Sequence, residues 1–193
     1  HFQRQFTGHY GVPLGAYVRQ MRLKQAGLRL AYRRDTVTAI GFDAGYDSTE
    51  AFSRAFRAFA GQSPSQFRRN PDWCGWNAAT GPLDAMRREF MSQEFNLSEV
   101  RIVDFPATRI ALLSHHGDPR REGDSIRRFI AWRRENGLHP DRSATFNLCY
   151  NDPFEAGEDY RIDIAASCDL VAPNEHGVIG GEIPGGRCAV LRV

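Results

Sequence analysis

Residues 45–69 read GYDSTEAFSRAFRAFAGQSPSQFRR, and this stretch decides the fold of the first part of the chain. Within it, Phe52, Phe56 and Phe59 recur at the spacing of a single helix face. Ser48 is a suitable N-cap before that helix, and Gly61 is suited to end it. The stretch therefore predicts a short helix with one buried apolar face and one polar face that the core does not need.

The residues just before this helix predict a second helix joined to it by a tight turn. Thr36 can cap a helix over residues 37–44, and Gly45 suits the left-handed residue that stops it. Residues 36–60 thus follow the helix-turn-helix pattern. In such a unit the second helix enters the major groove of DNA with its first residues at base edges. The pattern alone also fits an amphipathic helix of any small bundle, and both readings stay open at this point.

The polar face of the second helix carries side chains that can read or hold DNA. Its members are Thr49, Glu50, Ser53, Arg54 and Arg57. An arginine can donate two hydrogen bonds to guanine, and a glutamate can accept one from the amino group of cytosine. A serine or threonine can hydrogen-bond to either base.

The charge of the chain is divided between its two parts. Residues 1–70 contain 11 Lys and Arg but four Asp and Glu, a net charge of +7, whereas residues 71–193 carry a net charge of −5. A basic first part favours a polyanionic partner such as DNA. The alternative is a solvated basic surface with no partner.

Composition and spacing argue against several other classes of protein. No apolar run approaches the roughly 18 residues that a membrane span needs, so we expect no membrane partner. The cysteines are far apart, which predicts free thiols in a reducing cytoplasm; they are Cys74, Cys149, Cys168 and Cys188. Adjacent strand residues His115 and His116 point to opposite faces, which argues against a shared metal. We see no nucleophile–base spacing and no phosphate loop, and therefore expect neither an enzyme nor a cofactor.

From residue 100 the pattern changes to that of strands. Alternating apolar residues predict strands around residues 100–112, 145–151 and 159–170, with further strands near 177–183 and 187–193. A helix is expected over residues 121–136. The order β-β-α-β-β-β-β predicts an α+β domain with a helix over an antiparallel sheet. Residues 71–98, with turn residues and two tryptophans, are expected to be a linker with a little helix.

The motif VTAIGFDAGYDSTEAFSRAFRAFAGQSPSQFRR, residues 37–69, closely resembles the second helix-turn-helix of AraC/XylS-type transcription regulators. HFQRQFTGHYGVPLGAYVRQMRLKQA, residues 1–26, looks like the tail of that family's first helix-turn-helix with its linker helix. The resemblance implies that two recognition helices read successive major grooves. Gln3 and Arg4 would face bases in one groove, and Thr49, Glu50, Ser53 and Arg54 would face bases in the next. By the same resemblance Arg57 and Arg68 would contact phosphate.

The second part resembles the GyrI-like effector-binding domain that some AraC-type regulators carry. The matching pieces include FPATRIALLSHHGDP, FIAWRRENGL, YRIDIAASC and EIPGGRCAVLRV. The resemblance implies two β-α-β-β repeats around a pocket for cationic, amphiphilic molecules, of which this sequence would contain a complete first repeat and the start of a second.

Aromatic residues of this part could form walls of such a pocket. Tyr150 and Asp163 are the candidate effector-binding residues, the carboxylate being a cation partner. Tyr160 is a further candidate wall. Phe146 and Trp132 could also be walls, but we favour for them a place in the core between helix and sheet.

The sequence therefore predicts an all-α helix-turn-helix domain over residues 1–70, a linker over 71–98 and an α+β domain over 99–193. We expect a sequence-specific DNA-binding transcription regulator, truncated at both ends. Its expected partners are double-stranded DNA, a small effector and RNA polymerase. The alternative function is a drug-sequestering or protein-interaction module tethered to DNA.

Overall fold

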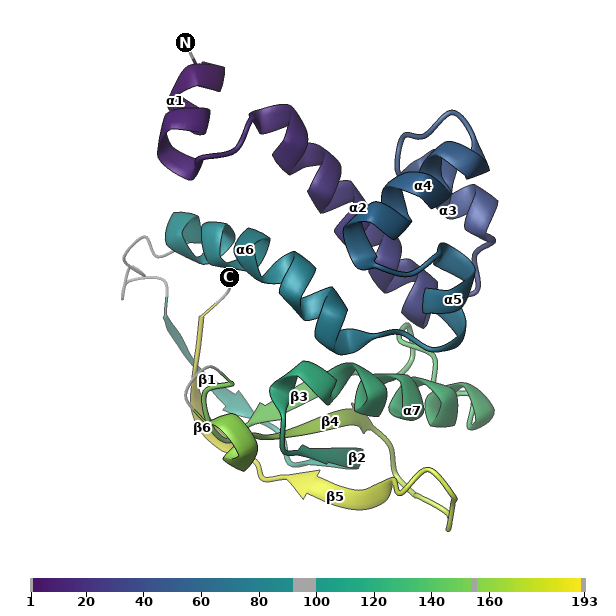
Figure 1. The fold of residues 1–193 in the computed structure, drawn as a ribbon. Helices are drawn as coiled ribbons and strands as arrows, with labels where there is room; N and C mark the ends of the chain where they lie inside the picture. The colour runs from purple at the N-terminus through teal and green to yellow at the C-terminus, as the bar shows by residue number, and fades with distance from the viewer. Residues whose placement is uncertain (1, 92–99, 154–155, 192–193) are drawn as a thin grey trace. The chain divides into compact units, whose positions relative to one another are not determined.

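The structure is a computed structural model that describes residues 2–91, 100–153 and 156–191. It divides into two compact units, His1–Gln93 and Glu94–Val193. The first unit is helical, and the second combines antiparallel strands with a packed helix (Figure 1). The expected order, an all-α part followed by an α+β part, is confirmed.

The helical unit contains six helices in the described residues: α1 (Phe2–Tyr10), α2 (Leu14–Tyr32), α3 (Val37–Asp43), α4 (Thr49–Ala60), α5 (Pro64–Arg69) and α6 (Trp73–Met91). Local signals set their ends. The hydroxyl of Ser48 accepts from the Ala51 amide at 3.1 Å at the start of α4. Gly45 and Gly61 have φ of 84° and 73°, the left-handed conformation that ends α3 and α4.

Aromatic side chains make most of the core of this unit. Its fully buried members include Leu30, Ile40, Phe52, Phe56 and Phe67, joined by Trp73 and Trp76. The rings of Phe67 and Trp76 lie 4.9 Å apart, and Phe59 meets Trp76 edge-on at 5.8 Å. The phenylalanine stripe of α4 is thus the inner face that the sequence predicts.

The segment after α5 is more ordered than the sequence indicates. Residues 73–91 form one helix, α6, whose Trp73, Trp76 and Leu83 are buried. We expected only a little helix there, because Gly75, Gly81 and Pro82 disfavour one. Burial of the two tryptophans against α2, α4 and α5 outweighs these local preferences. The linker role of residues 71–98 stays a prediction, and residues 92–99 lie outside the described part.

In the described part of the second unit lie β1 (Arg101–Phe105), β2 (Thr108–His116), α7 (Glu122–Glu135), β3 (Thr145–Cys149), β4 (Arg161–Ser167), β5 (Ile179–Ile183) and β6 (Gly186–Val190), with two short 3-10 helices. All strand pairs are antiparallel. Among the described residues, four strands form a sheet in the order β3-β4-β2-β5, while β1 and β6 pair only with each other. The strands β2, β3 and β4 with α7 follow the expected β-α-β-β order.

The four-stranded sheet has two different faces. The first face packs on α7 through a cluster that contains Leu113, Ile164, Ala166, Phe129 and Trp132. The second face is defined here by the strand registers as three rows of side chains. These rows are Ile179, Leu112, Ala165 and Phe146; then Ser114, Asp163 and Leu148; then His116, Arg161 and Tyr150. No helix among the described residues is long and apolar enough to cross a membrane.

Candidate functional sites

Helix α4 presents a polar surface because its opposite face is fixed in the core. Phe52 and Phe56 are fully buried, whereas Glu50, Arg54 and Arg57 are exposed. Burying two phenylalanines contributes several kcal/mol by area, roughly 2–3 for each ring. The helix is therefore held firmly with its charged side chains outward, the arrangement that contact with a polyanion requires.

The predicted base-reading residues at the start of α4 are partly engaged within the protein. Thr49 is half-buried, and its hydroxyl donates to the hydroxyl of Thr38 at 3.2 Å. Ser53 is also half-buried. Glu50 and Arg54 project further, so they are better placed than the two hydroxyl residues to reach a base edge.

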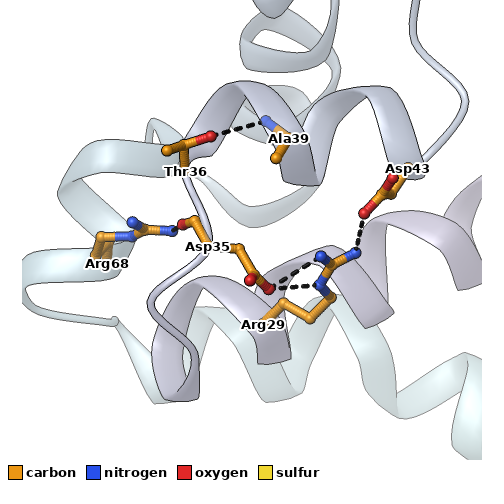
Figure 2. Close-up of polar contacts among 6 residues, drawn as sticks. All are labelled: Arg29, Asp35, Thr36, Ala39, Asp43 and Arg68. Carbon is orange, nitrogen blue, oxygen red and sulfur yellow. Dashed lines mark hydrogen bonds and ion pairs between the residues drawn. The ribbon is translucent and has the colours of Figure 1, made fainter.

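One arginine of α2 holds both ends of α3 (Figure 2). Arg29 donates from Nε and Nη2 to Asp35 Oδ2 at 3.1 and 2.9 Å, just before α3 begins. It donates from Nη1 to Asp43 Oδ2 at 2.8 Å, at the last residue of α3. The two carboxylates raise the pKa of Arg29, with the hydrogen bond to Asp43 as the largest cause. A seven-residue helix is too short to be stable alone, so this clamp helps to set where α3, and hence α4, lies.

Arg68 is tied to the same loop. Its Nη2 donates to the backbone carbonyl of Asp35 at 2.6 Å, which links α5 to the loop between α2 and α3 (Figure 2). This bond gives Arg68 a structural role. Its predicted contact with phosphate stays a prediction, and a single guanidinium has donors for both.

Gln3 and Arg4 lie exposed on α1. Figure 1 shows α1 at one end of α2 and the α3–α4 pair at the other end. A 19-residue helix such as α2 spans about 28 Å. Successive half-sites in the major groove lie about 34 Å apart along DNA, a comparable separation.

The two predicted effector residues lie in direct contact on the second face of the sheet. Tyr150 donates its hydroxyl to Asp163 Oδ2 at 2.7 Å. Asp163 is 2% exposed, whereas Tyr150 is 53% exposed. An exposed tyrosine thus contacts a buried carboxylate through its hydroxyl.

The charge of Asp163 is stabilised although the residue is buried. Burial raises its pKa, but hydrogen bonds from Ser114 and Tyr150 and the charge of Arg161 outweigh it, so the pKa lies below its ordinary value. The hydrogen bond to Asp163 raises the pKa of the Tyr150 hydroxyl. A buried, ionised carboxylate favours a cation as its partner.

The other aromatic candidates divide between the two faces. Trp132 is a residue of α7 and lies in the core between this helix and the sheet, as we favoured. Phe146 does not: its register with Ala165 puts it on the second face, where it meets Phe105 edge-on at 6.3 Å. Tyr160 is buried near α7 and donates its hydroxyl to Glu122 at 3.1 Å, so it forms no wall of the second face.

Arg161 is a functional candidate that the sequence analysis missed. Its guanidinium lies over the ring of Tyr150, 4.1 Å from the centroid, and its Nη2 lies 3.4 Å from Asp163 Oδ2. The signal was available, because residues 161 and 163 of one strand share a face. Ser114 was missed as well, since its place beside Asp163 depends on the pairing of β2 with β4.

The two adjacent histidines occupy different environments. His115 is buried, with Nδ1 3.0 Å from the Ser125 hydroxyl and Nε2 3.1 Å from the Asp118 carbonyl. His116 is exposed on the second face. Among the described residues there is no group of three or more His, Cys, Asp or Glu that could hold a metal ion.

Comparison with known families assigns both units. The model of a helix-turn-helix domain matches residues 1–70, and that of a GyrI-like small molecule binding domain matches residues 98–193. The chain joins an AraC-type helix-turn-helix domain to a GyrI-like domain.

Relatives of this two-domain chain include proteins named as regulators. It is 42% identical over 97 residues to the probable transcriptional regulator YgiV of Escherichia coli K12, covering 49% of this chain and 61% of the relative. It is 36% identical over 73 residues to the transposon Tn10 TetD protein of Escherichia coli, covering 38% and 53%. With the right origin-binding protein of Escherichia coli K12 it shares 34% identity over 73 residues, covering 38% and 25%. The chain spans less than two thirds of each of these relatives.

Proposed function

We propose that this chain is the DNA-reading and effector-sensing part of a transcription regulator. The observation that carries the proposal is α4, whose phenylalanines are buried while Glu50, Arg54 and Arg57 are exposed. The basic helix-turn-helix domain binds double-stranded DNA, and the GyrI-like domain binds a small molecule that alters this binding.

The predicted DNA-contacting residues divide in the proposal into those that read bases and those that contact phosphate. Gln3 and Arg4 on α1 read one major groove, and Glu50 and Arg54, with Thr49 and Ser53, read the next. Arg57 and Arg68 contact phosphate. The length of α2, about 28 Å, supports base contacts in two major grooves that lie one DNA turn apart. Phosphate contacts supply affinity and register, whereas base contacts supply specificity.

The second face of the sheet is the proposed effector site. Asp163 supplies the negative charge and Tyr150 an aromatic ring, the two groups that recognise an organic cation. The neighbouring row of Leu112, Ala165 and Phe146 supports binding of an apolar part of the same molecule. We therefore propose a cationic, amphiphilic effector.

The proposal extends to partners and place in the cell. A regulator that reads DNA acts on transcription through RNA polymerase, which we propose as a further partner. It works where the chromosome lies, in the cytoplasm of a bacterium, and it catalyses no reaction. Relatives named as transcriptional regulators support this assignment.

The test is titration of the full 193-residue chain into labelled DNA, followed by fluorescence anisotropy. The DNA upstream of its own gene is compared with a scrambled duplex, each at roughly 50 and 200 mM salt. We expect a preference for the upstream DNA that persists at the higher salt. Equal binding to both duplexes that collapses with salt would contradict sequence-specific reading.

The alternative function is sequestration of a drug or a partner protein near DNA. It predicts that a ligand binds the GyrI-like domain without changing DNA affinity. Allosteric regulation instead requires a ligand-dependent change of affinity, and the coupling is reciprocal. Repeating the DNA titration with saturating ligand separates the two functions.

A further inference from the structure

The proposed effector site already contains a positive charge supplied by the chain itself. Arg161 and Asp163 lie two residues apart on β4 and share the second face. The guanidinium of Arg161 is 4.1 Å from the centroid of the Tyr150 ring and 3.4 Å from Asp163 Oδ2. It therefore meets both groups that a cationic effector would contact.

Arg161 is not firmly held at this position. An N–O distance of 3.4 Å is long for a charge-assisted hydrogen bond, which is normally about 2.7–2.9 Å. The Nε of Arg161 is buried and makes no hydrogen bond within the described residues. Its side chain is 43% exposed, against 3% for that of Asp163, so the guanidinium can leave toward solvent.

Asp163 needs a positive partner whenever it is ionised and buried. Tyr150 and Ser114 donate neutral hydrogen bonds, which do not compensate the charge. If Arg161 moves away, another cation must take its place or water must enter. An organic cation with an apolar body can replace the charge of Arg161 beside Asp163. Its apolar part can also pack on the neighbouring row of the second face, which is apolar.

From these contacts we infer that Arg161 is a built-in competitor of the effector, a side chain that fills the cation site until a cationic ligand displaces it. The inference rests on the proposed function of the second face. Arg161 then sets the threshold of the sensor, because the ligand must outcompete a tethered cation. It also determines specificity, because a neutral ligand cannot replace the charge that Arg161 withdraws.

The test uses three probes of nearly identical shape and different charge: benzamidine, benzamide and benzoate. Binding to the full chain is measured by titration with NMR detection. The variants are Arg161→Ala, which removes the side chain, and Arg161→Gln, which removes the charge but keeps most of the length. Arg109→Ala is the matched control, because Arg109 is exposed on β2 but does not belong to the second face. Thermal unfolding of each variant establishes that it folds.

We expect both Arg161 variants to bind benzamidine about tenfold more tightly than the unaltered chain, the effect of losing one cation–π contact and one ion pair. Arg109→Ala should leave the affinity unchanged, and benzamide should respond to none of these changes. Adding Asp163→Asn to Arg161→Gln should abolish the gain.

Each other outcome decides a separate point. If Arg109→Ala tightens benzamidine binding as much as the Arg161 variants do, the effect comes from the change in net charge, and the inference is overturned. Benzamidine binding that is unchanged in both Arg161 variants would also overturn it, but would leave the proposed cation site standing. Benzoate binding that disappears with Arg161 would make the arginine a ligand anchor, the opposite of a competitor. Absence of benzamidine binding in every variant would overturn the cation site itself, and the inference with it.

Discussion

Replacement of Gly27 by alanine tests how tightly α6 is packed into the helical unit. Gly27 lies in the middle of α2, and a Cβ added there would come within 2.0, 2.4 and 2.8 Å of three ring atoms of Trp76. Carbon atoms in contact are normally about 3.5–4.0 Å apart, so the indole would have to retreat by roughly 1.5 Å. Trp76 cannot retreat easily, because it is buried against the rings of Phe56, Phe59 and Phe67.

Two opposing terms decide the magnitude. Alanine in a helix interior is favoured over glycine by about 1 kcal/mol. Overpacking a rigid core costs about 1–3 kcal/mol, and occasionally more. We expect a net loss of about 1–2 kcal/mol in the free energy of unfolding. In a unit of this size that lowers the melting temperature by roughly 5–15 °C.

The assay is thermal and urea unfolding of the full chain, followed by tryptophan fluorescence. Two of the three tryptophans, Trp73 and Trp76, report on the helical unit. Gly15→Ala is the matched control, because Gly15 lies in the same helix with no atom within 4 Å of the added Cβ. It should be neutral or stabilising by up to about 1 kcal/mol. If Gly27→Ala proves as stable as the wild type while Gly15→Ala behaves as expected, the close packing of α2 on Trp76 is refuted.

Three further predictions concern charged residues. Arg54→Ala should weaken binding to the specific DNA site by about 1–3 kcal/mol and relax the preference for its sequence. Arg57→Ala should instead weaken binding to all DNA sequences equally and reduce the slope of log affinity against log salt by about 1. If both variants weaken binding to all sequences equally in anisotropy titrations, the separation of roles is refuted. Arg29→Ala should lower the stability of the helical unit by about 1 kcal/mol at low salt and by less at high salt, because its ion pairs are largely exposed; urea unfolding at two salt concentrations measures this. The lowered pKa of Asp163 means that its contribution to stability is present above the unfolded pKa of about 3.9 and is lost as the pH falls below it; Asp163→Asn should therefore lose less stability than the wild type between pH 5 and pH 3, as measured by urea unfolding.

Most helix ends could be predicted from the sequence because they depend on neighbouring residues. Thr36 and Ser48 act as N-caps, and Gly45 and Gly61 take the left-handed conformation, all as the sequence predicts. Such signals involve atoms within about four residues and do not depend on the rest of the fold. The order of strands and helix in the second unit follows in the same way from apolar periodicity.

Helix α6 shows where local signals mislead. Trp73, Trp76, Thr80 and Leu83 have helical spacing and are all buried. The sequence shows this helical spacing, but Gly75, Gly81 and Pro82 favour a linker over a helix. Long-range burial against the helix-turn-helix core decided in favour of a helix, which no local preference could reveal.

The candidate effector site was only half predictable. Tyr150 and Asp163 were identified by residue type and resemblance, and the structure brings them to 2.7 Å. The position of Arg161 over Tyr150 depends on the pairing of β3 with β4, and the side of the sheet that Phe146 occupies depends on the same register. Apart from α6, the sequence by itself determined which segments are helices and strands, because those choices are local. The tertiary structure alone decided which charges meet across strands, because pairing joins residues that are far apart in the chain.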